Sequence, residues 1–392
     1  MAIQFHTELI PEIPPHLIER KPKAVSKKSK KKLVRRTERD FSQILRRSYQ
    51  ALFLVMNIWL GGVFYVWVRQ FESGNLGDNS ARPAGVEGWL PIAGMMNAKY
   101  WVITGHIPEL HPAAMFLFLT FVAISFVFRK AFCSWLCPVG TISEYLWWAG
   151  RKIFGRNFRM WRWLDIPLRG LKYLLLGFFV WAVSSMSANA VAEFMRSDYG
   201  LIADVKMLNF FRFMGETGAI VIAVLVVASI FIQNFWCRYL CPYGALLGLT
   251  ALLSPLRIRR ESEACIDCAK CAKACPSLLA VDKLITVKSA ECTGCMQCVA
   301  VCPAKGALQM SPVWTRVTGI GNREKDRLDG RSGRPYTSWE MAVGIAVLYI
   351  GIVGFAKTAG YWNSDVPGAV YRQLVPHAND ATHAMPGDPG LR

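Results

Sequence analysis

Long apolar segments constrain this chain more than any other feature of its sequence. A helix crosses the hydrocarbon region of a bilayer with about 20 apolar residues, and about 17 is the lower end. Five segments without charged residues reach or approach that length, and each is predicted to be a transmembrane helix. They are residues 51–68, 112–128, 173–192, 217–236 and 341–356. The second is short, so its prediction depends on Arg129 and Lys130 extending from its end to the lipid headgroups.

Basic residues are distributed unevenly around these segments. Lys and Arg number 13, 3, 9, 3, 15 and 3 in the six stretches before, between and after them. Cytoplasmic loops of membrane proteins are rich in Lys and Arg. The alternation therefore predicts a multi-pass protein of the bacterial inner (cytoplasmic) membrane, with a cytoplasmic N-terminus and a C-terminus that is periplasmic or outside.

The net charge of +19 would also suit a nucleic-acid-binding protein. The densest basic run, residues 20–36, adjoins the first predicted span. In that position it is predicted to be a disordered topology determinant that is attracted to anionic lipid headgroups. The lipid membrane is therefore a predicted partner, and nucleic acid is not.

All 12 cysteines lie in four motifs, each on the predicted cytoplasmic side, where structural disulfides are not expected. The pattern C-x2-C-x2-C-x3-C-P occurs twice, as CIDCAKCAKACP and CTGCMQCVAVCP. In such runs three cysteines bind one 4Fe-4S cluster and the fourth reaches the other cluster. A pair of zinc sites would need neither the third cysteine nor the repeated Cys-Pro. The predicted ligands are Cys265, Cys268, Cys271 and Cys302 for cluster 1, and Cys292, Cys295, Cys298 and Cys275 for cluster 2.

These patterns predict an α-helical membrane protein of about five transmembrane helices, with an inserted α+β bacterial two-cluster ferredoxin-like domain. Short strands are expected at residues 284–287 and 307–310. The predicted units are a basic cytoplasmic tail (1–49), a membrane domain with four transmembrane helices (50–255), the two-cluster domain (256–312), a cytoplasmic linker (313–338), a fifth transmembrane helix (339–358) and a short outer tail (359–392).

The other four cysteines form an internal repeat, C-x2-L-C-P-x-G, at the cytoplasmic ends of two predicted spans. They are Cys133, Cys137, Cys237 and Cys241. On a continuing helix, cysteines at i and i+4 share a face, and the following Pro marks a bend or an end. A disulfide within a pair is disfavoured, because such β-carbons lie about 5–6 Å apart against about 3.8 Å in a disulfide.

Two interpretations of these membrane-edge pairs remain open. The four cysteines could form one further site for a cluster, a metal ion or a redox-active dithiol. Alternatively, the motif shapes the helix ends for packing or for docking of a partner.

Aromatic and histidine side chains give weaker signals. Tryptophans around the first inner loop, Trp135 among them, are predicted to be interfacial anchors. His106 and His111, in the outer loop before the second span, could serve a quinol or metal site, but a plain surface position is the favoured interpretation. The sequence has no CxxCH motif for covalent haem and no phosphate-binding glycine motif.

Taken together, the two membrane-edge pairs and the doubled cysteine run resemble the membrane-bound polyferredoxin family. That family includes the quinol-dehydrogenase membrane subunit of periplasmic nitrate reductase and the nitrous-oxide reductase regulator, whose ferredoxin-bearing core is similar. The resemblance covers residues 113–311. It departs from the regulator type, because the 49 mostly polar residues before Gln50 are too few for a flavin-binding domain.

The resemblance implies electron transfer as a subunit of an oxidoreductase. The predicted function is to pass electrons between the quinone pool, or a cytoplasmic donor, and a redox partner protein through two 4Fe-4S clusters. The alternative is a metalloenzyme assembly factor or copper-ion reductase that uses the same clusters. Quinol or quinone is thus a candidate partner.

Overall fold

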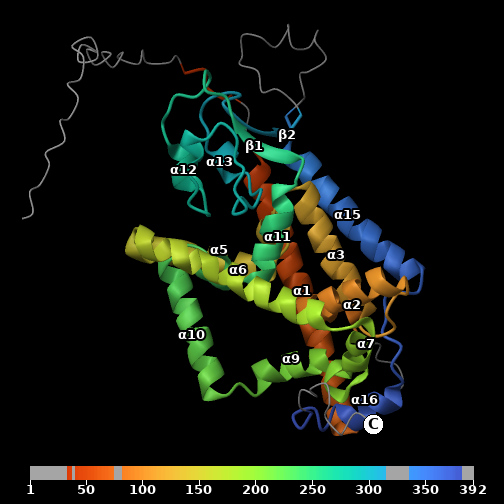
Figure 1. Ribbon diagram of the computed structural model, residues 1–392. Helices are drawn as coiled ribbons and strands as arrows, with labels where there is room; N and C mark the ends of the chain where they lie inside the picture. The colour runs from red at the N-terminus through yellow and green to blue at the C-terminus, as the bar shows by residue number, and fades with distance from the viewer. Residues whose placement is uncertain (1–32, 38–39, 75–81, 315–334, 382–392) are drawn as a thin grey trace, which may run out of the picture.

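The structure is a computed structural model that describes residues 33–37, 40–74, 82–314 and 335–381. It is largely helical and elongated (Figure 1). The cysteine-rich part, which holds both strands, lies at one end, and the C-terminal helix α16 (Gly368–Leu374) lies at the other. The two ends of the molecule therefore differ in secondary structure, and the long helices connect them.

Three helices form the centre of the connecting part: α1 (Ser42–Ser73), α3 (Pro112–Val127) and α15 (Ser338–Thr358). α15 begins with a capping box, in which Thr337 and Glu340 satisfy each other's backbone N–H groups. A β-carbon at Gly344 would lie 2.2 Å from the Phe128 ring. Glycine at this position therefore lets the end of α3 pack closely against α15.

A second group of helices extends to one side of this centre (Figure 1). It consists of α4 (Ala131–Trp135), α5 (Pro138–Phe154), α6 (Arg162–Ser185), α10 (Glu216–Phe231), the π-helical turn η3 (Trp236–Leu240) and α11 (Pro242–Leu252). α10 packs on α5, and α11 packs on both α3 and α6. A β-carbon at Gly150 would lie 1.9 Å from the Ile230 carbonyl oxygen, so α5 and α10 approach closely there.

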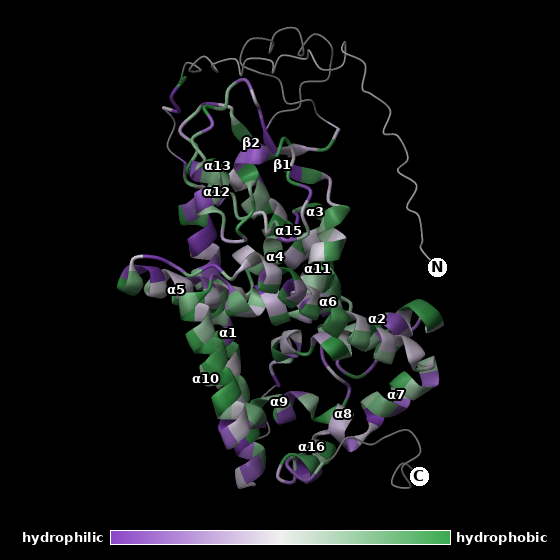
Figure 2. Cartoon of the chain, turned by 60° about the vertical axis from the view of Figure 1, so that its left-hand side comes forward, coloured by the Kyte–Doolittle hydropathy of each residue, from purple (hydrophilic) through white to green (hydrophobic). Residues whose placement is uncertain are grey.

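Apolar helices long enough to cross a membrane make this chain a membrane protein. Among the described residues three qualify, Ser42–Ser73, Trp163–Ser185 and Ser338–Thr358, and a fourth does if Ala203–Arg212 and Glu216–Phe231, bent by 80°, count as one span. α3 has 16 residues and is among the shorter apolar helices. Figure 2 shows the hydrophobic colouring of α10 and α1.

Two predicted spans have different boundaries in the structure. The helix predicted at 173–192 ends at Ser185, and Ser187 then caps α7 (Ala188–Arg196). The helix predicted at 217–236 ends at Phe231, and Asn234 adopts a left-handed conformation, with a φ of 51°. Neither turn contains a charged residue, so the absence of charge alone could not locate them. Arg129 and Lys130, expected to reach the headgroups, are instead 0% and 4% exposed.

Opposite the cysteine-rich end, short helices surround a buried charged cluster. They are η2 (Ala84–Trp89), α2 (Pro91–Thr104), α7, α8 (Asp198–Leu201), α9 (Ala203–Arg212) and α16. The Glu87 carboxylate, 0% exposed, accepts hydrogen bonds from Arg82, Ser364 and the Ala114 backbone N–H, and it also contacts a His111 ring nitrogen. Arg82 pairs on its other side with Asp204, which is also 0% exposed.

The cysteine-rich end contains a two-stranded antiparallel sheet, β1 (Leu256–Arg260) paired with β2 (Leu308–Pro312). β2 covers most of the strand predicted at 307–310. The segment predicted as a strand at 284–287 forms only an isolated bridge, between Thr286 and Arg259. β1 was not predicted, because three of its five residues are arginines; its apolar residues Leu256 and Ile258 are buried.

The described end of the basic N-terminal run is ordered against this sheet region. Arg35 forms an antiparallel bridge with Ala304, and the Arg36 backbone N–H donates to the Pro303 carbonyl oxygen at 2.9 Å. The prediction of disorder is therefore wrong for residues 33–37. Residues 20–32 of the run lie outside the described residues.

Candidate metal centres

The two C-x2-C-x2-C loops share one backbone conformation. Equivalent positions are left-handed in both: Asp267 and Gly294 have φ of 57° and 61°, and Ala269 and Met296 have φ of 55° and 56°. For a residue with a side chain this conformation costs roughly 1–2 kcal/mol. Alternation of left- and right-handed residues turns successive backbone N–H groups toward one point, as in many iron–sulfur sites. Both loops are therefore shaped to receive an anionic group.

The chain brings the thiols of these loops together in two sets. Burial raises the pKa of Cys302, from the second run, and so do the neighbouring Cys265 and Cys268; burial likewise raises the pKa of Cys271, near which Cys302 and Cys265 lie. In the other set, burial, together with the neighbouring Cys295 and Cys292 thiols, raises the pKa of Cys275 to about 12. Burial likewise raises the pKa of Cys298, and Cys295 contributes most among the neighbouring thiols. The fourth cysteine of each run thus belongs spatially to the other run.

The two sets differ in exposure. Cys268 of the first set is exposed, and its other members are partly exposed. Three members of the second set, Cys275, Cys295 and Cys298, are buried. Cluster 1 would therefore sit near the surface, and cluster 2 would sit inside the molecule.

The second loop is held directly by the membrane helices. The Ser134 hydroxyl of α4 donates to the Thr293 carbonyl oxygen at 2.7 Å, and the Trp135 indole N–H points to the Gly294 carbonyl oxygen at 3.4 Å. Gln43 of α1 donates to the Cys295 carbonyl oxygen at 2.9 Å. Trp135, expected to be an interfacial anchor, is instead fully buried as part of this contact. These bonds fix the position of the buried cysteine set relative to the helices.

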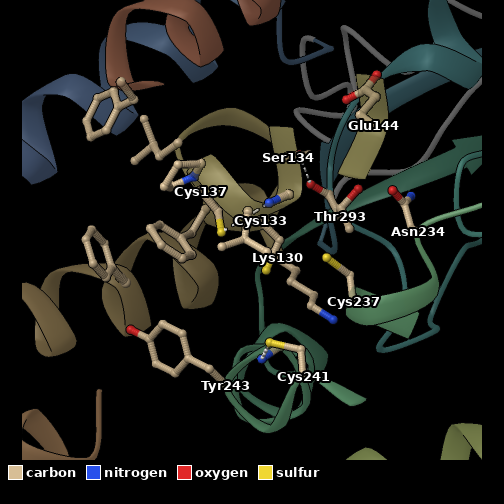
Figure 3. A pocket seen from close by; sticks show the side chains of 18 of the residues that line it. Lys130, Cys133, Ser134, Cys137, Glu144, Asn234, Cys237, Cys241, Tyr243 and Thr293 are labelled. Carbon is tan, nitrogen blue, oxygen red and sulfur yellow. Dashed lines mark hydrogen bonds between the residues drawn. The ribbon is translucent and has the colours of Figure 1, made fainter. Parts of the chain in front are cut away.

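Cys133, Cys137, Cys237 and Cys241 line a single cavity of about 240 Å³. Figure 3 shows the four sulfurs around the Lys130 side chain. All four thiols are free, so the structure contains no disulfide among them. The cavity wall also includes Cys295 of the second set. The two halves of the internal repeat therefore meet at one place, beside the buried part of the ferredoxin-like loops.

Helix capping explains the C-P-x-G part of the repeat. Cys137 is the N-cap of α5, and its sulfur accepts the Gly140 N–H at 3.5 Å. Cys241 is the N-cap of α11, and its sulfur accepts the Gly244 N–H at 3.2 Å. Proline follows each of these cysteines as the first residue of the helix, where it needs no hydrogen-bond donor. The cysteines of a pair therefore do not share one continuous helix, because the second cysteine begins a new one.

Glycine is required where the two cysteines of the first pair meet. A β-carbon at Gly140 would lie only 2.3 Å from the Cys133 carbonyl oxygen. The helix start therefore approaches the preceding turn closely, and both cysteines remain on the same side of the cavity. Each helix N-terminus also directs its positive dipole end at the cysteine sulfur, which favours a thiolate there.

Burial dominates the electrostatics of these thiols. It raises the pKa of Cys133 to about 12, although Lys130 opposes this, and it raises the pKa of Cys137 to about 11. The pKa of Cys237 also lies well above its usual value because of burial and then of Cys241. Burial lowers the pKa of Lys130, but Cys133 and Glu291 more than offset this, so its pKa is raised. Burial therefore disfavours a negatively charged thiolate in this cavity unless a positive charge lies nearby.

Within the described part of the chain, no three His, Cys, Asp or Glu residues are arranged to hold a single metal ion. A 4Fe-4S cluster makes a different demand, because each of its irons takes one cysteine and the four thiolates surround a larger group. Two sets of four thiols around nest-shaped loops fit that demand, and so does the four-cysteine cavity with its helix N-termini.

His111 belongs to none of these sites. It is 1% exposed, and its Nε2 lies 2.8 Å from the Gly200 carbonyl oxygen within the charged cluster around Glu87. The favoured surface position is therefore wrong for His111, whereas His106 is exposed as expected. The sequence contains no signal for this, because the residues that bury His111 come from distant segments.

Comparison with known proteins agrees with this geometry. A profile described as a 4Fe-4S dicluster domain matches residues 258–310, and one described as a 4Fe-4S binding domain matches residues 110–157 and 215–261. The YccM protein of Escherichia coli, whose name proposes electron transport, is 50% identical over 338 residues, which cover 85% of this chain and 90% of YccM. The chain belongs to the membrane-bound polyferredoxin family. It is an electron-transport membrane protein with iron–sulfur cluster domains of the ferredoxin type.

Other relatives match the chain at lower identity or over a smaller part of its length than YccM does. The ferredoxin-type protein NapH of Escherichia coli is 24% identical over 237 residues, covering 59% of this chain and 74% of NapH. The regulatory protein NosR of Pseudomonas aeruginosa is 32% identical over 164 residues, covering 41% of this chain but only 22% of NosR. No solved structure matches the chain. The resemblance predicted from the motifs is confirmed, and the likeness to NosR covers 22% of that protein.

Proposed function

We propose that this polyferredoxin takes electrons from a quinol in the bilayer and passes them to a redox partner protein, using two 4Fe-4S clusters and a third redox centre. The eight cysteines of the doubled run would hold the two clusters in the crossed sets described above. Cys133, Cys137, Cys237 and Cys241 would hold the third centre, also an iron–sulfur cluster. When bound, such clusters accept and release single electrons, and the chain supplies their ligands, burial and position.

One observation carries this proposal: the four membrane-edge cysteines and Cys295 line the same cavity. A redox centre there would be adjacent to the buried cluster site, and that site lies between the cavity and the exposed cysteine set. The three sites therefore form a series from the membrane helices to the surface. Cys268, which is exposed, marks the end of the series at which a partner would dock.

The same cavity supports quinol as the donor. Beyond the cysteines its wall is formed by apolar side chains of the membrane helices, including Phe53 and Met56 of α1 and Leu117 and Phe121 of α3. Ligand cavities for lipophilic molecules are typically lined in this way, with a few polar groups at one end. A quinol head group could thus approach the cysteines from within the bilayer. A cytoplasmic donor would have to enter from the exposed end instead.

The proposal includes the arrangement in the membrane. The alternating Lys and Arg content of the loops supports a cytoplasmic position, at a bacterial inner membrane, for the N-terminus and the α+β ferredoxin-like unit (256–312). It supports a position outside for the tail (359–392). Five spans require the short helix α3 and the bent helix pair to cross as well. Both ends of the molecule suit this assignment, since the cysteine-rich end and α16 lie at opposite ends of the long helices (Figure 1).

Iron content tests the third centre. The full chain is purified in detergent beside a variant with serine at Cys133, Cys137, Cys237 and Cys241. Loss of one of three 4Fe-4S clusters would remove about one third of the iron and acid-labile sulfide. The electron paramagnetic resonance signals of the two remaining clusters serve as an internal control for folding. Unchanged iron content together with an unchanged redox titration would contradict a third centre.

Reduction kinetics test the donor. A quinol analogue is expected to reduce the wild-type chain on a catalytic timescale and the four-serine variant much more slowly. The rival function, metalloenzyme assembly or copper-ion reduction, rests on the preference of soft thiolate ligands for Cu(I). Electron exchange with copper ions but not with the quinol analogue would favour that rival.

A further inference from the structure

Lys130 is a buried cation that lacks a partner among the described residues. It lies between α3 and α4 and is 4% exposed. Its ammonium group makes no hydrogen bond or ion pair with any residue in the described ranges. Burying a charge without a partner is costly, so such a group is normally paired or neutral. The position therefore calls for an anion that the polypeptide itself does not provide.

Two other buried cations nearby are paired with acids, whereas Arg129, which is 0% exposed, donates instead to the Ala251 and Ser289 carbonyl oxygens. Lys172 of α6, 0% exposed, forms an ion pair of 2.5 Å with Glu291. Arg238 of η3, 5% exposed, pairs with Asp165 at 3.1 Å. Glu291 is further satisfied by the Tyr173 hydroxyl at 3.2 Å. Glu291 attracts Lys130 at longer range, but Lys172 already pairs with it, so Lys130 has no acid partner of its own among the described residues.

That charge is directed at the four-cysteine site. A β-carbon at Gly244 would lie 3.4 Å from the Cys241 sulfur and 3.6 Å from the Lys130 nitrogen, so these two atoms lie within about 7 Å of each other at the start of α11. Figure 3 shows the ammonium group between Cys237 and Cys241. Lys130 also lines the cavity itself. An ammonium group donates to sulfur but cannot bind iron, so its effect on a centre there is electrostatic.

We propose that Lys130 is the counter-charge of the four-cysteine centre and raises its reduction potential. This inference rests on the proposed function, which places a thiolate-ligated cluster in the cavity. Four thiolates make such a centre anionic, and the reduced state carries one more negative charge than the oxidised state. A fixed cation therefore stabilises the reduced state more, and net charge is one of the factors that set cluster potentials. Lys130 keeps its proton and forms no bond when an electron from quinol, or from dithionite in the test, arrives.

The test compares Lys130→Met, Lys130→Arg and Lys288→Met in the full chain by redox titration monitored by electron paramagnetic resonance. The wave of the four-cysteine centre is first identified as the one that is lost in the four-serine variant. We expect Lys130→Met to move that wave to lower potential and to leave the other two waves in place. Lys130→Arg keeps the charge and should titrate close to wild type. Lys288 is an exposed lysine of the ferredoxin-like unit, and its loss should move no wave because solvent screens its charge.

The outcomes separate this inference from the proposal on which it rests. A wave that is present in Lys130→Met at the wild-type potential overturns the role of Lys130 but leaves the third centre intact. If the four-serine variant loses neither a wave nor iron, the third centre itself is refuted. If Lys130→Met fails to assemble, Lys130→Arg and Lys130→Gln decide: assembly with Arg but not with Gln supports the counter-charge, and assembly with Gln at an unchanged potential refutes it.

Discussion

Buried charges at the two ends of the molecule differ in one respect. At the end that carries α16, Glu87 and Asp204 are fully buried, Arg82 forms an ion pair with each of them, and His111 also contacts Glu87. At the cysteine-rich end, Lys130 is buried with no matching group among the described residues. A network in which every buried charge has a partner of opposite charge holds helices together, whereas a buried charge without such a partner indicates a binding site for a group of opposite charge. The comparison separates a structural charge cluster from a functional one without reference to any relative.

The largest effect is expected from breaking the complete network. Arg82→Met leaves Glu87 and Asp204 buried without their cation. Removal of one partner of a buried pair typically costs about 3–5 kcal/mol. The melting temperature in detergent should fall sharply, while the cluster potentials of the molecules that remain folded stay the same. A potential shift in this variant would contradict the separation of the two ends.

A smaller effect is expected at the helix start in the first cysteine pair. Gly140→Ala places a β-carbon 2.3 Å from the Cys133 carbonyl oxygen, so the turn between the cysteines must move. Overpacking of this kind costs about 1–3 kcal/mol. Iron content should fall as the four-cysteine centre is lost.

Gly61→Ala is the matched control for that variant. Gly61 lies inside α1, and a β-carbon there would meet nothing within 4 Å. The substitution should leave the iron content unchanged and should stabilise the helix by about 0.5–1 kcal/mol. Equal iron loss in both variants would mean that the close approach at Gly140 is unimportant.

The contact between α4 and the second cysteine loop should show a weaker effect. Ser134→Ala removes the 2.7 Å hydrogen bond to the Thr293 carbonyl oxygen. A single neutral hydrogen bond contributes about 1 kcal/mol. Hydrogen exchange of the loop should accelerate while the iron content remains that of the wild type. If exchange is unaffected, the other bonds to this loop are sufficient to hold it.

The smallest effect concerns pH at the end that carries α16. Burial lowers the pKa of His111, but Glu87 raises it more, so the folded pKa lies above the usual value of about 6.5. A raised pKa means that this contribution to stability is complete below about pH 6.5 and is lost as pH rises through the folded pKa. The melting temperature should therefore decline over that window, and His111→Gln should flatten the decline. An identical pH profile in the variant would show that His111 does not titrate there.

The clustering of the cysteines was predictable because its signal is local, whereas cluster binding by these cysteines stays a prediction. Spacing alone grouped the cysteines of each run, and the repeat around Cys133 and Cys237 indicated a shared place. Lys130 was interpreted as a headgroup anchor, since its neighbour in sequence is an apolar span and the thiols that surround it include some from a distant segment. Trp135 and His111 were misjudged for the same reason. Burial of a polar side chain at the end of a helix depends on tertiary packing, which local composition does not record.

Strand β1 could not be predicted from its sequence. Three of its five residues are arginines, and the burial of its alternate residues depends on pairing with β2, which lies far away along the chain. Helix ends were also hard to locate, because the turns after Ser185 and Phe231 lie within segments that contain no charged residue. In both cases the decisive contact is made by residues far away along the chain.

The capped helix starts at Cys137 and Cys241 have a consequence for biogenesis. Each lies in one of the two cysteine pairs of the proposed four-cysteine centre, and the two pairs are synthesised at different times. Neither pair would complete that centre alone, so the cavity is finished only after the intervening helices have folded and α11 has docked on α3 and α6. Loading of the proposed cofactor would therefore follow the assembly of this part of the chain.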